Sequence, residues 1–295
     1  MHFLVNLALK ARGSLNKPHD YGYIDKITMG EKIPKVVHQT YSSKNLPELV
    51  KKNIEKLKAN NPDWQFRLYD DYDRKSYIAE NYPKLLTLYH KINPEYGAAR
   101  ADFFRYLVIY KEGGVYLDIK SGADKRLTEI VRDSDKYLLS HWPRHYPKIM
   151  HGQHPGITNP IGELQQWHVI SVSGHPFLKL VIENVCHNIQ HYNPILHDYG
   201  SWGVFNLTGP IAYTEPIYPL IDKYPNRLEN NHEDLGLIYV ALETNNNLSG
   251  HHQVFEKPHY SKLEESITSQ PLYILILFSL SKPLIKFIKK LKRVK

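Results

Sequence analysis

The chain has 295 residues, of which 42% are hydrophobic and 23% charged, as in an ordinary globular protein of one large or two small domains. Its formal net charge is +8, but the excess of basic residues is confined to the two ends, three before Asp20 and seven from Lys282 onward. The remainder carries 28 basic against 30 acidic residues. A nucleic-acid-binding domain should have its positive field on the folded body, so this distribution argues against one.

The single cysteine, Cys186, excludes an internal disulfide framework and fits a reducing compartment. The first residues lack a small-residue cleavage site, so we expect no secretory signal. The apolar run 272–280 is about half the ~20 residues that a membrane-spanning helix needs. These features predict a cytoplasmic protein.

The C-terminal tail is the candidate membrane contact. Leu284, Ile285, Ile288 and Leu291 recur at helical spacing, and lysines fill the other face. This pattern is typical of an in-plane helix on an anionic membrane surface. Two alternatives are a solvated basic end and a nuclear-localisation or RNA-binding tail. We expect a leader at 1–30, one domain at 31–265 and a membrane-associating tail at 270–295.

The first half of the chain alternates strands with helices. Strands are predicted at 35–40, 65–69 and 115–118, the first opened by Pro34. An amphipathic helix follows the first strand and stops at 60–62; further helices are predicted at 74–81, 83–92 and 94–112. The glycine pair 113–114 closes the last of these. The alternation predicts an α/β fold with a mostly parallel central sheet flanked by helices.

Polar residues stand where these strands end. They are His38, Gln39, Asp70, Asp71 and Asp118. Ligands of such sheets bind beyond the carboxyl ends of the strands, so this edge is the predicted site.

The second half carries weaker patterns. Residues 140–170 are rich in His, Pro and Gly and are predicted to be a long loop. A helix is predicted from Pro176, and a turn at 208–210 should precede another short helix. The segment 235–242 fits either a late strand or a helix.

Asp102 and Arg105 share one face of the predicted helix 94–112, whose remaining residues are strongly apolar. Two charged side chains on a buried helix need partners, because unpaired burial is costly. They could form only a local ion pair. Alternatively they bind a ligand that carries hydroxyls and a diphosphate, since a carboxylate accepts from hydroxyls and a guanidinium binds an anion.

Asp118, at the end of the third strand, suits metal binding or ribose recognition, although an aspartate there is more commonly a turn residue. Among the 17 histidines, the pairs 141 with 145 and 151 with 154 have no Cys, Asp or Glu at zinc-like spacing. We interpret them as loop histidines. No P-loop, nucleophile elbow or three-glycine dinucleotide motif occurs.

Four blocks of the sequence together resemble glycosyltransferase family 32, the DXD sugar-binding transferases that include yeast-type mannosyltransferases and share this segment with glucosylating clostridial toxins. The blocks are IPKVVHQTY, NPDWQFRLYDD, AARADFFRY and GGVYLD, in the family's order within residues 33–125. The sequence TGP at 208–210 is similar to a later block.

The resemblance implies a GT-A fold with a Rossmann-like nucleotide-binding half, and a retaining sugar transfer from a UDP- or GDP-sugar. It implies donor contacts from the first strand (His38, Gln39), and from Arg100 and Tyr116. Asp102 would hold donor sugar hydroxyls with Arg105 beside it. Asp118 would contact the ribose or a metal-bound diphosphate.

The chain departs from the family where the second aspartate of the DXD motif, the usual ligand of Mn²⁺ or Mg²⁺, is Lys120. Asp118 could still hold a metal with Asp124 or with a carboxylate or histidine from the C-terminal half. Lys120 could instead neutralise the leaving diphosphate. Thirdly, the site could be degenerate. The family places a late histidine near the diphosphate, which implies His252, with His259 as competitor.

The sequence therefore predicts a peripherally membrane-bound, retaining glycosyltransferase. It would move a hexose or N-acetylhexosamine to a surface polysaccharide or lipid-linked glycan, with Asp102, Arg105, Asp118 and Lys120 as its catalytic residues. The alternative is a non-catalytic nucleotide-sugar or glycan-binding protein, which Lys120 favours.

Overall fold

A six-stranded sheet forms the centre of the molecule in the computed structural model, which describes residues 15–142, 152, 154, 156–157, 159–242, 254–255 and 259–293. The sheet has the order β2-β1-β3-β6-β5-β7, with β1 at Val36–Thr40, β2 at Gln65–Tyr69, β3 at Gly114–Leu117, β5 at Tyr137–Ser140, β6 at His168–Ser171 and β7 at Arg227–Glu229. A second, two-stranded sheet pairs β4 (Gly122–Ala123) with β8 (Leu237–Ile238).

Helices follow most of the strands. They are α2 (Glu48–Asn60), α3 (Asp71–Asn81), α4 (Leu86–Lys91), α5 (Gly97–Glu112), α6 (Leu127–Ile130), α7 (Pro176–His191), α8 (Pro194–His197), α9 (Gly200–Leu207), α10 (Pro210–Ile217), α11 (His232–Leu235) and α12 (Leu272–Arg293). Short 3₁₀ turns lie at Pro83–Leu85, Tyr218–Leu220 and Tyr260–Lys262.

The sheet is parallel in its first half and mixed in its second. Val37 of β1 lies opposite Phe66 of β2 and Val115 of β3, all three strands running the same way. β6 runs antiparallel to β3 and β5, and β7 is parallel to β5. The predicted α/β fold, with a mostly parallel central sheet flanked by helices, is confirmed.

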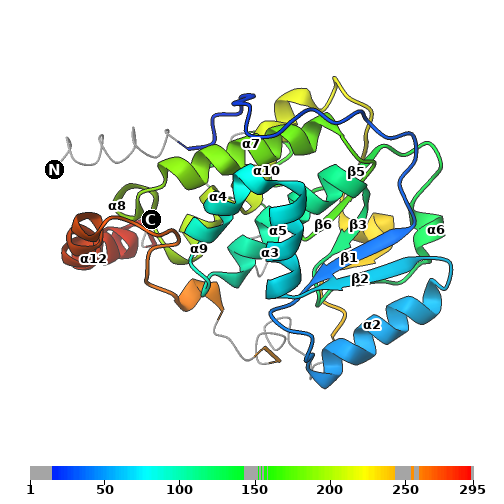
Figure 1. Ribbon diagram of the computed structural model, residues 1–295, viewed down its shortest axis with the longest axis horizontal. Helices are drawn as coiled ribbons and strands as arrows, with labels where there is room; N and C mark the ends of the chain where they lie inside the picture. The colour runs from blue at the N-terminus through cyan, green and yellow to red at the C-terminus, as the bar shows by residue number, and fades with distance from the viewer. Residues whose placement is uncertain are drawn as a thin grey trace.

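Side chains of successive strand residues enter opposite faces of the sheet, as the two-residue period of a strand requires. Tyr116 of β3 packs into the larger core, together with α4, α5 and α7. Its neighbours Val115 and Leu117 pack into the smaller core, on the face that α2 and α6 cover. Figure 1 shows α5 and α7 on one side of the sheet and α2 on the other.

The helix α5 is deeply buried, with 11 of its 16 residues in the core. It lies between the sheet and α7 (Figure 1). Gly113 ends it at a φ of 74°, a left-handed conformation that glycine adopts without strain. This C-terminal turn leads directly into β3 and thereby fixes the position of Asp118 relative to α5.

Two of the predicted elements differ in the structure, and one that was left open between strand and helix is resolved. The strand β6 occupies residues predicted to be loop, because its sequence HVIS begins and ends with polar residues and shows no apolar run. Asp118 lies one residue beyond β3 rather than within it. The segment 235–242 contains the short strand β8, preceded by the single turn α11. A loop prediction for residues 143–151 lies outside the described residues.

The described part of the predicted leader packs against α7. Glu183 of α7 is fully buried. Its carboxylate accepts hydrogen bonds from the backbone N–H groups of Tyr21, Tyr23 and Ile24, with N···O distances of 3.0 Å each. Lys179, one helical turn earlier, lies 3.7 Å from the same carboxylate. Three charge-assisted hydrogen bonds thus hold residues 21–24 of the leader to α7.

The C-terminal helix α12 lies at the edge of the molecule, beside α8 (Figure 1). Phe278 faces the body and its ring packs edge-on against Tyr199, with 5.4 Å between the centroids. The other side is apolar and exposed: Leu272 and Leu280 are 73% and 74% accessible, and Ile276 between them is 52% accessible. In the described residues, no helix combines the length and apolar character required to cross a bilayer.

Candidate active site

A cavity of about 1070 Å³ opens beyond the carboxyl ends of β1 and β3. Its wall includes residues of α5, of the segment that precedes β6, and of the loops around α9 to α11. Five residues predicted for the site line it: Asp102, Arg105, Tyr116, Asp118 and Lys120. The structure thus brings together side chains from α5 and from the chain around β3. The strand-end argument placed Asp118 at this edge, and the family resemblance implied Asp102 and Arg105 in the same site.

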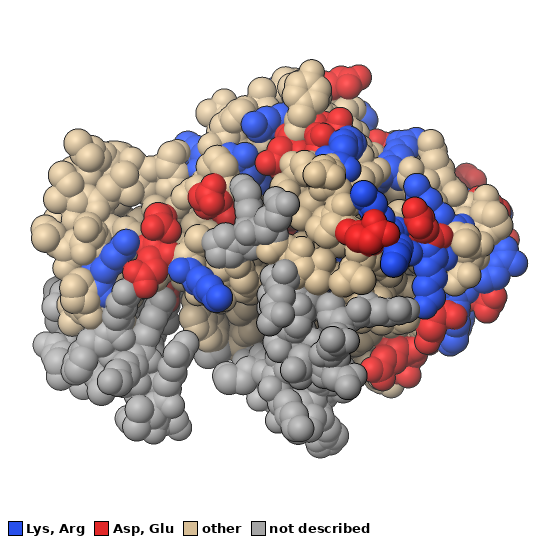
Figure 2. Space-filling view, turned by 90° about the horizontal axis from the view of Figure 1, so that it is seen from below, with Lys and Arg blue, Asp and Glu red and all other residues tan. Residues whose placement is uncertain are grey.

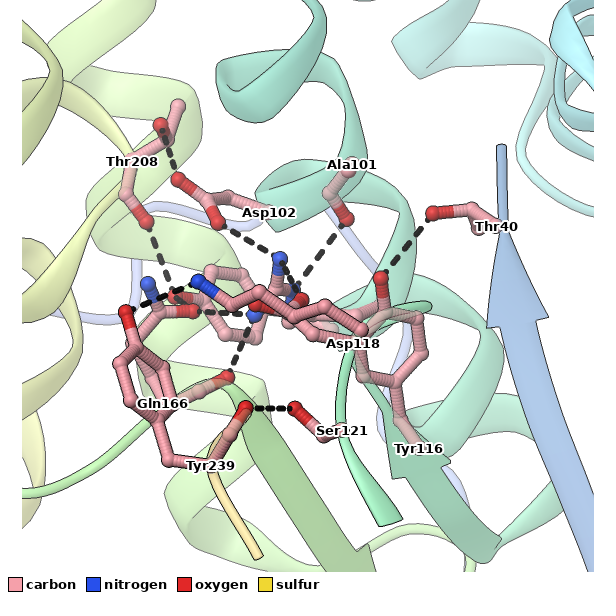
Figure 3. A network of polar contacts seen from close by, with 12 residues as sticks. Thr40, Ala101, Asp102, Tyr116, Asp118, Ser121, Gln166, Thr208 and Tyr239 are labelled. Carbon is pink, nitrogen blue, oxygen red and sulfur yellow. Dashed lines mark hydrogen bonds and ion pairs between the residues drawn. The ribbon is translucent and has the colours of Figure 1, made fainter. Parts of the chain in front are cut away.

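Arg105 joins the two aspartates. Its Nη2 lies 3.0 Å from Asp102 Oδ1 and 3.0 Å from Asp118 Oδ1. Asp102 Oδ2 also accepts a hydrogen bond from the Thr208 hydroxyl at 3.0 Å (Figure 3). The ion pair of Asp102 and Arg105 is therefore not only local to α5, because Arg105 also binds Asp118 just after β3.

The remaining N–H groups of Arg105 are also engaged. Nη1 donates to the backbone carbonyl and the side-chain oxygen of Gln166, at 2.6 and 2.8 Å, and Nε donates to the Ala101 carbonyl at 3.5 Å. The guanidinium lies 4.6 Å from the centre of the Tyr116 ring. With its planar group held on all sides, Arg105 orients two carboxylates toward the cavity.

Asp102 is almost entirely buried, which has a consequence for its protonation. Burial, with a smaller contribution from the charge of Asp118, raises the pKa of Asp102 from its ordinary value of 3.8 to about 6, although Arg105 opposes the shift. Asp118 is more open, with 24% of its side chain accessible. The two carboxylates therefore differ in access to ligands.

Beneath these groups, the end of β1 contacts β3. The Thr40 hydroxyl lies 3.0 Å from the Tyr116 hydroxyl (Figure 3). Thr40 and the next two residues, Tyr41 and Ser42, line the cavity. At the end of β2, Asp70 caps α3, and Asp71 and Arg74 form an ion pair at the cavity wall.

Three residues predicted to bind the donor do not line the cavity. His38 and Gln39 are buried within β1, and His38 Nδ1 lies 3.0 Å from the Tyr69 hydroxyl. Burial lowers the pKa of His38 to about 3, so it is neutral. Arg100 is buried and donates to the Ile92 carbonyl at 3.0 and 2.7 Å. The strand runs to Thr40, as predicted, so its accessible end lies two residues past His38.

Lys120 reaches the cavity from the turn after β3. Its Nζ donates to the Tyr239 hydroxyl at 2.9 Å and lies 4.1 Å from the centre of that ring. The backbone around the two residues is also joined, since Ser121 Oγ donates to the Tyr239 carbonyl at 2.8 Å (Figure 3).

The described side chains do not make up a site for Mn²⁺ or Mg²⁺. These ions take several oxygen ligands, commonly carboxylates. Here Asp118 is the carboxylate at the expected position, its Oδ1 is bound to Arg105, and the ammonium of Lys120 lines the same cavity. Among the described residues, no group of three or more His, Cys, Asp or Glu could hold a metal ion.

The late histidines divide into those described and those outside the described residues. His252 belongs to the second group. His259 lines the cavity, and its Nδ1 lies 2.8 Å from Ser261 Oγ. Asp124 is also a wall residue. Of the histidine pairs interpreted as loop residues, His141 and His154 are described, and His154 is a wall residue too.

Sequence reasoning missed the wall opposite Asp102. It includes Trp142, Trp167 and Tyr239, whose rings pack on one another, and a buried acid, Glu163. Glu163 binds the indole N–H of Trp142 at 2.9 Å and His154 Nε2 at 2.6 Å. These residues stand far apart in a segment without periodicity, so the only available signal was its unusual content of Trp and His.

Comparisons with known proteins agree with the motif argument. Residues 47–137 match the family described as "Glycosyltransferase sugar-binding region containing DXD motif". The predicted resemblance to the DXD glycosyltransferases is thereby confirmed.

Two curated relatives are fungal. An inositol phosphoceramide mannosyltransferase of Schizosaccharomyces pombe is 30% identical over 72% of this chain and 52% of its own length. A mannosyl phosphorylinositol ceramide synthase of Saccharomyces cerevisiae is 27% identical over 73% of this chain and 50% of its own. The chain thus spans about half the length of these relatives. Among solved structures, the PaToxG glycosyltransferase is similar with a TM-score of 0.47 and 19% identity, covering 74% of this chain and 78% of its own.

Proposed function

We propose that this chain, which carries the sugar-binding region of the DXD glycosyltransferases, is a retaining glycosyltransferase. It transfers a hexose or N-acetylhexosamine from a UDP- or GDP-sugar to a glycan or lipid-linked acceptor. The observation that carries the proposal is the group Asp102–Arg105–Asp118 at the mouth of a strand-end cavity. The names of the two fungal relatives contain mannosyl or mannosyltransferase together with an inositol-containing ceramide lipid. These names favour mannose as the transferred sugar and a lipid-linked acceptor.

The residues divide the work as follows. Asp102 accepts hydrogen bonds from donor sugar hydroxyls, and Thr208 keeps its second oxygen in place. Asp118, the more accessible carboxylate, accepts from the ribose. Arg105 is a positioning residue, because the carboxylates and Gln166 already occupy its N–H groups.

The nucleotide lies over the end of β1. Thr40, Tyr41 and Ser42 supply this surface, and Tyr116 supports it from below. His38 and Gln39 support the strand from inside the sheet. Arg100 fixes the turn before α5 through the Ile92 carbonyl.

A donor panel tests the proposal. Thermal shift with UDP-, GDP- and CDP-sugars, GDP-mannose among them, identifies the donor, and radiolabelled donor reports hydrolysis and transfer. Asp102→Asn and Asp118→Asn should each lower kcat/KM by about a hundredfold or more, since each removes a contact to the reacting donor. Asp133→Asn, on an exposed surface carboxylate, is the matched control. Unchanged activity in both site variants would show that the site is wrongly assigned.

The alternative class is a nucleotide-sugar or glycan-binding protein without turnover. Lys120 in place of the second aspartate favours it. Thermal stabilisation by a donor with no hydrolysis or transfer, at any metal concentration, would support this binder and refute the enzyme.

We further propose that α12 attaches the protein to the cytoplasmic face of an anionic membrane. The support is the exposed apolar row Leu272, Ile276, Leu280 and Leu284, continued in sequence by basic residues and no acid. On the face seen in Figure 2, by contrast, both signs of charge lie interspersed.

Vesicle sedimentation tests the attachment. The double variant Ile276→Ser with Leu280→Ser should lose about tenfold in affinity for vesicles with 30% phosphatidylserine, because it removes apolar area from the bilayer contact. Leu228→Ser, at an exposed leucine of β7, is the control and should bind as the parent does. Equal binding by the double variant, or by a chain that ends at residue 271, would refute the role of α12.

A further inference from the structure

Lys120, which stands at the second aspartate position of the DXD motif, contacts the ring of Tyr239. Lys120 Nζ donates to the Tyr239 hydroxyl at 2.9 Å and stands 4.1 Å from the ring centre. The contact combines a hydrogen bond with a cation–π interaction, and together they restrict the rotamers of the lysine side chain. In the described part of the chain, no carboxylate is paired with Lys120, so its charge is available to an anion.

The backbone on both sides of this contact is fixed. The strands β4 and β8 pair directly after Lys120 and before Tyr239, and Ala241 N donates to the Lys120 carbonyl at 2.8 Å. Ser121, fully buried, donates to the Tyr239 carbonyl. The ring of Tyr239 also packs edge-on against Trp142, with 5.1 Å between the centroids. Such a site needs little reorganisation when a ligand arrives.

The other cations of the cavity wall are already engaged. Arg105 binds Asp102 and Asp118, and Arg74 binds Asp71. A nucleoside diphosphate that enters beside Asp118 brings negative charge that these paired groups do not neutralise. Lys120 is two residues from Asp118. Among the described wall residues, it is the lysine whose positive charge can neutralise the diphosphate.

We propose that Lys120, positioned by Tyr239, binds the diphosphate of the donor in place of a divalent metal and stabilises it as the leaving group. This inference rests on the proposed function. In the transfer, the bond between the anomeric carbon and the diphosphate oxygen breaks, and its electron pair stays on that oxygen. The acceptor oxygen bonds to the anomeric carbon on the same face, and the acceptor proton passes to the departing diphosphate. No proton of Lys120 is transferred in this step.

The comparison of parent and variants in EDTA and in Mn²⁺ tests this. Donor hydrolysis and transfer by the parent in EDTA should lie within about twofold of the rate in Mn²⁺. Lys120→Met should lower kcat by about a hundredfold in both, as removal of one charged group at a developing anion does, and should weaken UDP or GDP binding measured by calorimetry. Lys120→Asp should be inactive in EDTA and regain activity with Mn²⁺, since it restores a metal-binding carboxylate.

Variants at Tyr239 separate positioning from packing. Tyr239→Phe retains the ring over Lys120 and should lower kcat by about threefold to tenfold with little change in KM, whereas Tyr239→Leu should approach Lys120→Met. Lys125→Met, at an exposed lysine in the next turn, is the matched control and should behave as the parent. Thermal melts without ligand should show that all variants fold.

Three results would overturn the inference. The first is a parent that is active only with Mn²⁺, which leaves the glycosyltransferase proposal intact. The second is Lys120→Met with parental kcat and parental affinity for UDP and GDP. The third is a parent that neither binds nor turns over any donor in either buffer, which removes the proposed function as well.

Discussion

The substitution Glu183→Gln tests how the N-terminal segment is held to the body. The carboxylate has no exposed surface and accepts three backbone N–H groups at 3.0 Å, two on Oε2 and one on Oε1. A glutamine of the same shape retains one acceptor oxygen. Its NH₂ group must then face either the N–H of Ile24 or those of Tyr21 and Tyr23, and the ion pair with Lys179 is lost.

The magnitude follows from these contacts. A hydrogen bond to a charged group contributes about 1.5–3 kcal/mol, and a buried N–H left unpaired costs about 1–3 kcal/mol. We therefore expect Glu183→Gln to lower the free energy of unfolding by roughly 3 kcal/mol, a large part of the roughly 5–15 kcal/mol typical of a domain.

Urea denaturation measures this loss, and limited trypsin digestion reports whether cleavage after Lys26 becomes faster. The control is Glu80→Gln on α3, where the side chain is exposed and little change is expected. A loss below about 0.5 kcal/mol with parental digestion would refute the reasoning, because surface substitutions alone have effects of that size.

Three further predictions concern other parts of the chain. The raised pKa of Asp102 means that the native state holds this proton more tightly than the unfolded state. Its contribution to stability is therefore present below about pH 4 and lost as the pH rises through about 6, and Asp102→Asn should flatten this slope in urea titrations. Burial raises the pKa of the Cys186 thiol, so a disulfide reagent should react with it only at the rate of unfolding. Gly114→Ala should lower the free energy of unfolding, measured by thermal denaturation, by about 3 kcal/mol or more. The reason is that φ is +102° and the new Cβ would lie 2.6 Å from the Val36 carbonyl oxygen. Gly97→Ala, where the new Cβ meets open space, is the control and should be nearly neutral.

The first half of the fold was predictable because its patterns are local. Period-two and helical spacing, with the Gly113–Gly114 stop, located β1 to β3 and α2 to α5 within a few residues. The face of α5 that carries Asp102 and Arg105 was also predictable, since both interrupt an apolar helix. The strand-end rule placed Asp118 at the edge of the sheet, and only the family resemblance implied a shared site with Asp102 and Arg105.

The remainder of the site depends on distant contacts. Gln166, Thr208 and Tyr239 complete the environment of Arg105, Asp102 and Lys120, yet each follows its partner by 60 residues or more. No short pattern encodes such a pairing. His38 and Gln39 were expected near the accessible end of the first strand, but this strand runs to Thr40 and both side chains are buried within it.

The burial of α5 links donor binding to the stability of the whole fold. Asp102 and Arg105 stand on a helix with 11 of 16 residues buried, so they cannot move away from Asp118 without opening the core. Donor occupancy and global unfolding are then linked: a ligand at a hundred times its Kd adds about 2.7 kcal/mol to stability. The slowest amide protons of α5 should exchange about a hundredfold more slowly in that solution, and this makes hydrogen exchange at α5 a measure of donor affinity that requires no turnover.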